Sequence, residues 1–187
     1  MTTATLTAPD LQNRLGTDVL RLLDVRTPGE FESTRIPGSY NVPLPVLSRY
    51  ARRLAERSEV PLVVLCQTGA RSRQAAEVLA PHGIEPLVLE GGIVAWQSGG
   101  GQVEEGDPKW NLERQVRLTA GGIVLGSIAA STVVPRARYV AGAIGGGLFF
   151  AALSNTCLMG DMLGKLPYNR GSRAEVEAAV DELNRTA

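Results

Sequence analysis

The sequence predicts an α/β domain, with a parallel sheet covered by helices, followed by an α-helical hairpin that spans a membrane twice. Between residues 6 and 99, short apolar runs alternate with stretches of helical periodicity, as in βαβ units. Further on, residues 118–135 and 139–160 contain no charged residue and no histidine. A helix needs about 20 apolar residues to cross a bilayer. We therefore expect the α/β domain over residues 1–100, a linker over 101–110, the hairpin over 111–170 and a C-terminal cytosolic helical tail over 171–187.

Three apolar runs in the first half predict strands, at residues 20–25, 62–65 and 86–89. Between them, residues 44–57 and 72–80 have helical spacing. Residues 99–108 are rich in glycine and polar residues, which is typical of a linker. In the tail, Ser172 stands three residues before Glu175, a pairing that predicts a capped helix start.

Composition excludes several classes of function. Nineteen basic and nineteen acidic residues cancel over the 187 residues, so no nucleic-acid partner is indicated. Two cysteines are too few for a disulfide framework, and a single histidine cannot build a histidine cluster, so we expect no metal and no cofactor. Residues 1–6 lack the basic and apolar segments of a secretion signal. We therefore expect the first domain and the C-terminus to be cytoplasmic.

The sequence around Cys66 predicts a catalytic loop. The apolar run 62–65 ends at this cysteine, and a helical segment begins a few residues later. In parallel sheets, functional groups lie just past the carboxyl ends of strands. Backbone N–H groups of the loop, together with the helix N-terminus, would stabilise a thiolate there without a histidine base. We expect Cys66 to be the nucleophile and the following six residues to bind substrate: Gln67, Thr68, Gly69, Ala70, Arg71 and Ser72.

Particular roles follow from the residue types in this loop. Gly69 allows a tight turn because it tolerates a positive φ, Arg71 supplies a fixed cation for a bound anion, and Ser72 is placed to cap the helix. Two alternatives stay open at this point. Cys66 is a buried structural cysteine, or the loop belongs to a cysteine phosphatase or arsenate reductase. In the phosphatase pattern the arginine lies six positions after the cysteine, whereas Arg71 lies five positions after Cys66.

The segment Cys-Gln-Thr-Gly-Ala-Arg-Ser at 66–72 resembles the active loop of rhodanese-homology domains. Further segments support the resemblance in order along residues 6–100: Leu23-Asp24-Val25-Arg26 with Glu30-Phe31, residues 35–43, Leu89-Glu90-Gly91-Gly92, and Ala95-Trp96. The resemblance implies a rhodanese-like sheet and a sulfurtransferase. Cys66 would take a sulfane sulfur from a donor such as thiosulfate and pass it, through a persulfide, to an acceptor such as cyanide.

The sequence departs from the family pattern at two positions, and two charged residues are candidates to support the site. Gln67 stands where many thiosulfate-using members have a basic residue, which leaves the physiological donor open. Arg35 stands where the family usually has histidine. Asp24 and Arg26 follow a predicted strand, and we interpret them as a structural pair that supports the site, or as groups that frame it directly.

The two apolar stretches predict a transmembrane hairpin joined at residues 135–138. Gly122 with Gly126, and Gly142 with Gly146, have the spacing of small-residue contacts between membrane helices. Basic residues flank the stretches in a way that favours both ends inside, hence an inner-membrane protein. The alternative is a hairpin buried in a soluble protein. Residues 111–114 with Arg117, and 157–169, resemble a bacterial two-helix membrane domain, and its fusion to a rhodanese domain resembles bacterial inner-membrane rhodaneses.

Cys157, near the end of the second stretch, has two interpretations. It is a small packing residue, or a second thiol that accepts sulfur or lines a path for a sulfur anion. The expected partners are small sulfur anions, the lipid bilayer and, through the glycine-rich faces, a second copy of the chain. Two alternatives to turnover also remain: a persulfide or redox sensor, and a component of thiocyanate or sulfur-anion export by an oligomeric hairpin.

Overall fold

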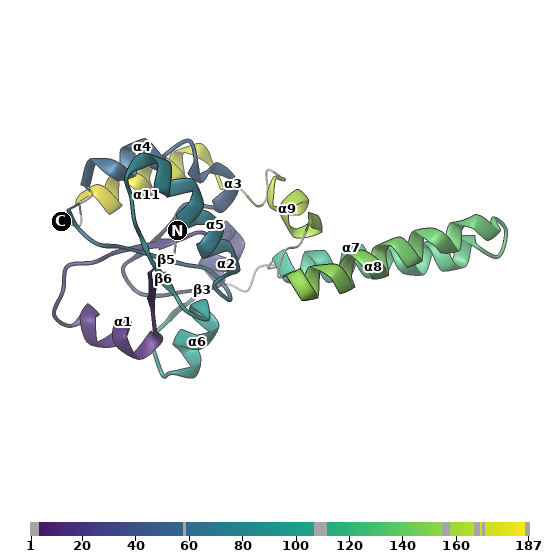
Figure 1. Cartoon of the computed structure of the whole chain (residues 1–187), viewed down its shortest axis with the longest axis horizontal. Coiled ribbons are helices and arrows are strands. Elements are labelled where there is room, and N and C mark those ends of the chain that lie inside the picture. The colour runs from purple at the N-terminus through teal and green to yellow at the C-terminus, as the bar shows by residue number, and fades with distance from the viewer. Residues whose placement is uncertain are drawn as a thin grey trace. The chain divides into compact units, whose positions relative to one another are not determined.

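The computed structural model describes residues 4–57, 59–106, 112–154, 158–166, 169 and 171–185. The chain forms two compact units (Figure 1). The first consists of Met1–Lys109 together with Pro167–Ala187, and the second of Trp110–Leu166. Each unit is described below by itself.

The first unit contains the predicted parallel sheet. Its five strands are ordered β1-β6-β5-β2-β4, and every neighbouring pair is parallel. The strands are β1 (Thr5–Leu6), β2 (Arg21–Asp24), β4 (Ser39–Asn41), β5 (Leu62–Leu65) and β6 (Leu87–Leu89). The central strands β2 and β5 are buried along their whole length, as expected for a sheet covered on both faces. A small antiparallel sheet joins β3 (Thr34–Arg35) to β7 (Glu104–Glu105).

Helices cover both faces of the sheet (Figure 1). One core lies beneath α3 (Leu44–Leu47), α4 (Ala51–Leu54), α5 (Ala70–Leu79) and α11 (Arg173–Arg185). The other lies beneath α1 (Ala8–Leu15) and α6 (Gly92–Ser98). The predicted helix over 44–57 is broken into α3, α4 and the 3-10 turn η1 (Ala55–Arg57). The short helix α2 (Pro28–Ser33) follows β2.

Helix α11 belongs to the core of the α/β unit, although the sequence suggested a tail. Val176, Val180 and Leu183 are at most 3% exposed and form part of the core beneath α4 and α5. The Nδ2 of Asn184 donates to the carbonyl oxygen of Arg53 at 2.9 Å. The cap predicted at Ser172 is present, because its hydroxyl accepts from the Glu175 N–H at 3.2 Å. The α/β unit is therefore discontinuous in sequence, and a helix that follows the hairpin completes it.

The second unit is a helical hairpin. It contains α7 (Leu112–Ala130), the 3-10 turn η3 (Pro135–Ala137), α8 (Arg138–Ser154) and α9 (Leu158–Gly164). Helix α7 packs along α8. Among the described residues, one stretch, Pro135–Ser154, is long and apolar enough to cross a membrane. Two spans were expected. The apolar part of α7 runs only from 118 to 130 within the helix, about 20 Å of a core that is about 30 Å thick.

The glycines of the hairpin do not form the expected contacts within the chain. Among the residues that the structure describes, a Cβ added at Gly122, Gly126, Gly142 or Gly146 would meet no atom within 4 Å beyond its own helix backbone. The packing of α7 on α8 therefore does not depend on close approach at these positions, and a role for them toward a second copy stays a prediction.

Candidate active site

Cys66 lies directly after β5, at the carboxyl edge of the parallel sheet. Its side chain is buried, and its Sγ accepts a hydrogen bond from the Gly69 N–H at 3.1 Å. This tight turn depends on Gly69, whose φ of 96° lies in the left-handed region. Helix α5 begins at the next residue, and the positive φ predicted for Gly69 is confirmed.

The N-terminus of α5 adds donors beside the thiol. The N-cap is Gly69, and no side chain caps the helix. The first N–H groups of an α-helix have no partner within the helix, and the helix dipole is positive at this end. The expectation that Ser72 caps α5 is wrong, because the helix starts at Ala70 and Ser72 is its third residue. The Ser72 hydroxyl is fully buried and has no partner among the described residues.

A second glycine-rich turn supports the loop from the neighbouring strand. The N–H groups of Ile93 and Val94 donate to the carbonyl oxygens of Cys66 and Gln67, at 2.9 and 3.3 Å. Gly92 has a φ of 60°, and a Cβ there would collide with both carbonyl oxygens. Gly92 is thus required by the close approach of α6 to the Cys66 loop.

Arg71 is held by a buried carboxylate. Its Nη1 and Nη2 donate to Oε2 and Oε1 of Glu30, each at 2.8 Å. The same carboxylate accepts from the Thr27 N–H at 2.9 Å and completes a capping box at the start of α2. Burial alone raises the pKa of Glu30, but the hydrogen bonds and charge of Arg71 outweigh it, so the pKa lies below its usual value. For Arg71, burial lowers the pKa, but Glu30 and, to a smaller extent, Cys66 raise it above its ordinary value.

Glu30 was missing from the predicted site residues. Two patterns in the sequence point to it: the Thr-x-x-Glu spacing of a capping box, and its place in the Glu-Phe segment of the family resemblance. Neither reveals that it pairs with an arginine 41 positions away. The anion-contact role predicted for Arg71 stays a prediction, with two of its five N–H groups engaged by Glu30.

Asp24 and Arg26 form the buried pair that the sequence suggested. Their closest N–O distance is 2.7 Å, and the side chains are 0% and 3% exposed. Arg26 also donates to the carbonyl oxygen of Thr34 at 2.6 Å and to the Gln67 Oε1 at 3.5 Å. Burial raises the pKa of Asp24, although the charge of Arg26 opposes the shift. The pair therefore ties the end of β2 to Thr34 and to Gln67, the residue that follows Cys66.

The remaining predicted residues lie around the loop or elsewhere. Thr68 is exposed and Ala70 is half-buried. Arg73 is exposed, and its Nη1 lies 3.8 Å from the point where a Cβ of Gly69 would be. Arg35 pairs with Glu104 at 2.7 Å and joins the small sheet. Cys157 lies outside the described residues. Among the described residues, no group of three His, Cys, Asp or Glu side chains could hold a metal ion.

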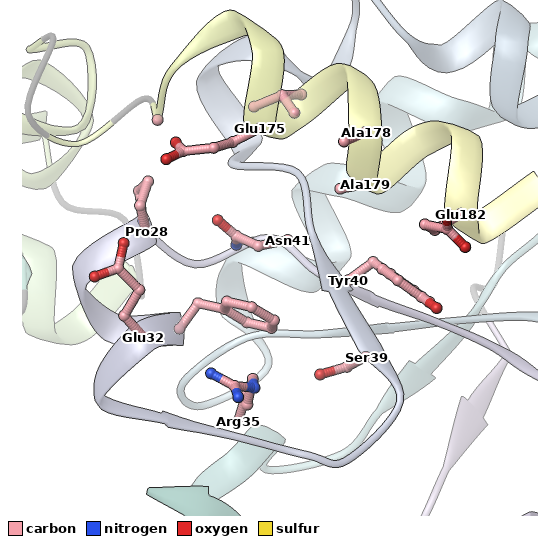
Figure 2. Close-up of a pocket in the computed structure, with 13 residues that line it drawn as sticks. Pro28, Glu32, Arg35, Ser39, Tyr40, Asn41, Glu175, Ala178, Ala179 and Glu182 are labelled. Atoms are coloured by element: carbon pink, nitrogen blue, oxygen red, sulfur yellow. The ribbon is translucent and has the colours of Figure 1, made fainter. Parts of the chain in front are cut away.

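A cavity of about 430 Å³ adjoins this edge of the sheet, between α2, β4 and α11 (Figure 2). Asn41 lines it, and its Nδ2 donates to the carbonyl oxygens of Asp24 and Arg26, both at 2.9 Å. Glu175, Ala178, Ala179 and Glu182 of α11 form the opposite wall (Figure 2). Cys66 is not among the lining residues, so this cavity is separate from the thiol loop.

Known proteins match both units. The family model of the rhodanese-like domain matches residues 7–99. The family model named inner membrane protein YgaP-like, transmembrane domain, matches residues 111–172. An uncharacterised protein of Synechocystis is 38% identical over 172 residues, 90% of this chain and 95% of the relative. A protein of Allochromatium vinosum named sulfurtransferase is 36% identical over 92 residues, 46% of this chain and 80% of that one.

A solved structure agrees with the fold. The crystal structure of a rhodanese-related protein from Thermoplasma volcanium superposes with a TM-score of 0.50 and 31% identity, over 54% of this chain and 97% of the other. The parallel sheet, the cysteine loop and these matches define the first unit as a rhodanese-like domain of a sulfurtransferase-type family. The whole chain belongs to the family in which this domain is followed by a YgaP-like transmembrane domain.

Proposed function

We propose that this protein is a membrane-anchored sulfurtransferase in which Cys66 takes a sulfane sulfur from a donor and passes it to a thiophilic acceptor. The observation that supports this most directly is the position of Sγ at the end of β5, 3.1 Å from the Gly69 N–H and beside the uncapped start of α5. Negative charge on the sulfur is favoured in such a place. The described part of the site contains no histidine, so the backbone supplies this stabilisation.

The same geometry suits the persulfide. When the Cys66 thiolate attacks the outer sulfur of a donor, the terminal sulfur of Cys66–S–S⁻ carries the charge and lies one bond further from the strand. N–H groups at the start of α5 have no intrahelical acceptor and are available to it. An acceptor such as cyanide then attacks the terminal sulfur and returns the thiolate. The buried sulfur and the short loop favour a single transferred atom over a phosphate group.

Two membrane crossings are favoured by the way the α/β unit is built. Residues before and after the hairpin fold into one unit, because α11 is part of its core. This arrangement favours a position of both hairpin ends on the same side of a membrane. A single crossing by α8 would separate them, so if α8 crosses, α7 crosses back. The basic residues that flank the hairpin favour the cytoplasmic side for this unit.

The proposal is tested on purified full-length protein in detergent, alongside Cys66→Ser. Incubation with a sulfane-sulfur donor should add the mass of one sulfur atom to wild type, and addition of cyanide should remove it and yield thiocyanate. Cys66→Ser should do neither. Repeated turnover that saturates with donor supports an enzyme. A single uptake of sulfur without release would support a sensor and overturn the proposal, as would equal activity in Cys66→Ser.

A further inference from the structure

We infer that the two segments connecting the α/β unit to the hairpin position the sulfur-transfer site, because they hold the two ends of α2 and so keep Glu30 against Arg71. The inference rests on the proposed sulfurtransferase function. It gives Gly106 and Gly171 a role in the reaction as positioning residues. These glycines lie four residues before and five residues after the hairpin unit, Trp110–Leu166.

The first connecting segment is bound to the C-terminal end of α2. The Gly106 N–H donates to the carbonyl oxygen of Ser33, the last residue of the helix, at 3.1 Å. The last carbonyl groups of a helix have no partner within it, and this bond satisfies one of them. A Cβ added at Gly106 would collide with the Glu32 carbonyl oxygen, so the two backbones approach closely. Strand β7, directly before Gly106, pairs with β3, directly after α2. The end of α2 is therefore tied to the chain that leads into the hairpin.

The second connecting segment lies against the first residue of α2. Gly171 has a φ of 74°, and a Cβ added there would lie 3.1 Å from the Cγ of Pro28, closer than an ordinary contact. The chain is fixed immediately afterwards, because the Ser172 N–H donates to the Glu175 Oε2 at 3.0 Å at the start of α11. The segment that returns from the hairpin therefore limits the movement of α2 at its start.

Helix α2 depends on these contacts at its ends. It has six residues, and a helix of this length is not stable by itself. Pro28, Phe31 and Glu32 border the cavity of about 430 Å³ between α2, β4 and α11, so this side of the helix is not close-packed (Figure 2). Glu30 on the same helix is buried. A shift of α2 would therefore move a carboxylate inside the protein.

Such a shift reaches the sulfur through Arg71. Both carboxylate oxygens of Glu30 accept from Arg71 at 2.8 Å, and this bidentate contact fixes the plane of the guanidinium as well as its position. Burial lowers the pKa of the Arg71 guanidinium, whereas Glu30 and, to a smaller extent, the charge of Cys66 raise it, so Arg71 lies within electrostatic reach of the sulfur. The position of α2 therefore determines where a fixed cation stands relative to the persulfide.

The first measurement is sulfur transfer by the full chain in detergent, with a sulfane-sulfur donor and cyanide. Gly106→Ala drives a methyl group against the Glu32 carbonyl oxygen and should lower kcat about tenfold, because a small displacement of a positioning group has a large effect on a rate. Gly171→Ala should also lower kcat, by a smaller factor. The matched control is Gly16→Ala, where an added Cβ makes only an ordinary contact of 3.7 Å, and its kcat should equal that of wild type.

A second measurement needs no sulfur transfer. Iodoacetate and iodoacetamide alkylate the same thiolate, so the ratio of their rates at Cys66, measured from the mass of its peptide, reports the cation beside the sulfur. Both connection variants should lower this ratio about twofold or more, and the control should not. Glu30→Gln with Arg71→Gln removes the ion pair without leaving a buried charge alone. In that background Gly106→Ala should have no further effect on the ratio, whereas a general loss of structure would lower it equally in both backgrounds.

A kcat and a ratio equal to those of the control in either connection variant overturn the inference. An equal effect of Gly106→Ala with and without the ion pair overturns it too. These outcomes leave sulfur transfer by Cys66 intact. If wild type transfers no sulfur, the proposed function fails instead, and the alkylation ratios still decide whether the connecting segments position Arg71.

Discussion

Strands β2 and β5 of the α/β unit are buried along their whole length, whereas α8 of the hairpin contains no buried residue. Phe149 and Phe150 are 70% and 66% exposed, while Arg21 in the α/β unit is 1% exposed. The α/β unit thus buries this charge with hydrogen bonds to the carbonyl oxygens of Leu54 and Val60, and the hairpin leaves large apolar side chains uncovered. Exposed apolar surface of this extent marks a site of contact with membrane or protein. The first unit is therefore stabilised by its own buried core. The second unit needs a membrane or another protein to cover its apolar side chains.

The largest expected effect concerns the part of the α/β unit that lies after the hairpin. Val180 of α11 is fully buried, so Val180→Asp places an unpaired charge in the core and should destabilise the unit by more than about 4 kcal/mol. Ala178→Asp, two positions away on the exposed side of the same helix, should change stability by less than about 0.5 kcal/mol. Urea unfolding of the full chain in detergent measures both. Equal stability of the two variants would show that α11 does not complete the core.

A smaller loss of stability is expected from a substitution in the turn that supports the Cys66 loop. Gly92→Ala combines a φ of 60° with a collision against the carbonyl oxygens of Cys66 and Gln67, and should cost about 3 kcal/mol. Gly38 has a similar φ of 74° but nothing within 4 Å of an added Cβ. Gly38→Ala should therefore cost only about 1 kcal/mol. The difference between their urea midpoints isolates the collision, and identical midpoints would remove it from the explanation.

The third effect is a pH dependence that Glu30 confers on the α/β unit. Its pKa is lowered in the folded state, so the Glu30–Arg71 pair contributes stability above the unfolded pKa of about 4.5. That contribution is lost as the pH falls through the lower folded pKa, and each unit of separation is worth about 1.4 kcal/mol. Thermal unfolding of wild type and Glu30→Gln should differ at pH 7 and converge on acidification. A difference that stays constant with pH would contradict the assignment.

The features that the sequence predicted correctly are those formed by residues close together in the chain. The run 62–65, the cysteine after it and the glycine that turns the loop lie within eight residues, so one segment determines the site. The Glu30–Arg71 pair joins residues 41 apart, and no local pattern specifies it. The capped helix of α11 was predicted from Ser172 and Glu175, but a helical pattern does not specify which surface of the protein the helix covers. The prediction that Ser72 caps α5 was wrong because Gly69, whose φ lies in the left-handed region, is the N-cap and the helix begins at Ala70.

The smallest effect is expected in the hairpin, where it separates intrachain packing from contacts to other molecules. Gly146 of α8 has no neighbour within 4 Å of an added Cβ, so Gly146→Ala should leave α7–α8 packing unchanged and raise helix stability by up to about 1 kcal/mol. Ala120 of α7 is 3% exposed, and Ala120→Leu should weaken the hairpin by about 1–3 kcal/mol through overpacking. Loss of helicity on heating in detergent compares the two. If Gly146→Ala is instead the more damaging change, the glycine face is packed in solution. Because no atom of the described residues lies within 4 Å of that Cβ position, a second copy would then be the expected neighbour.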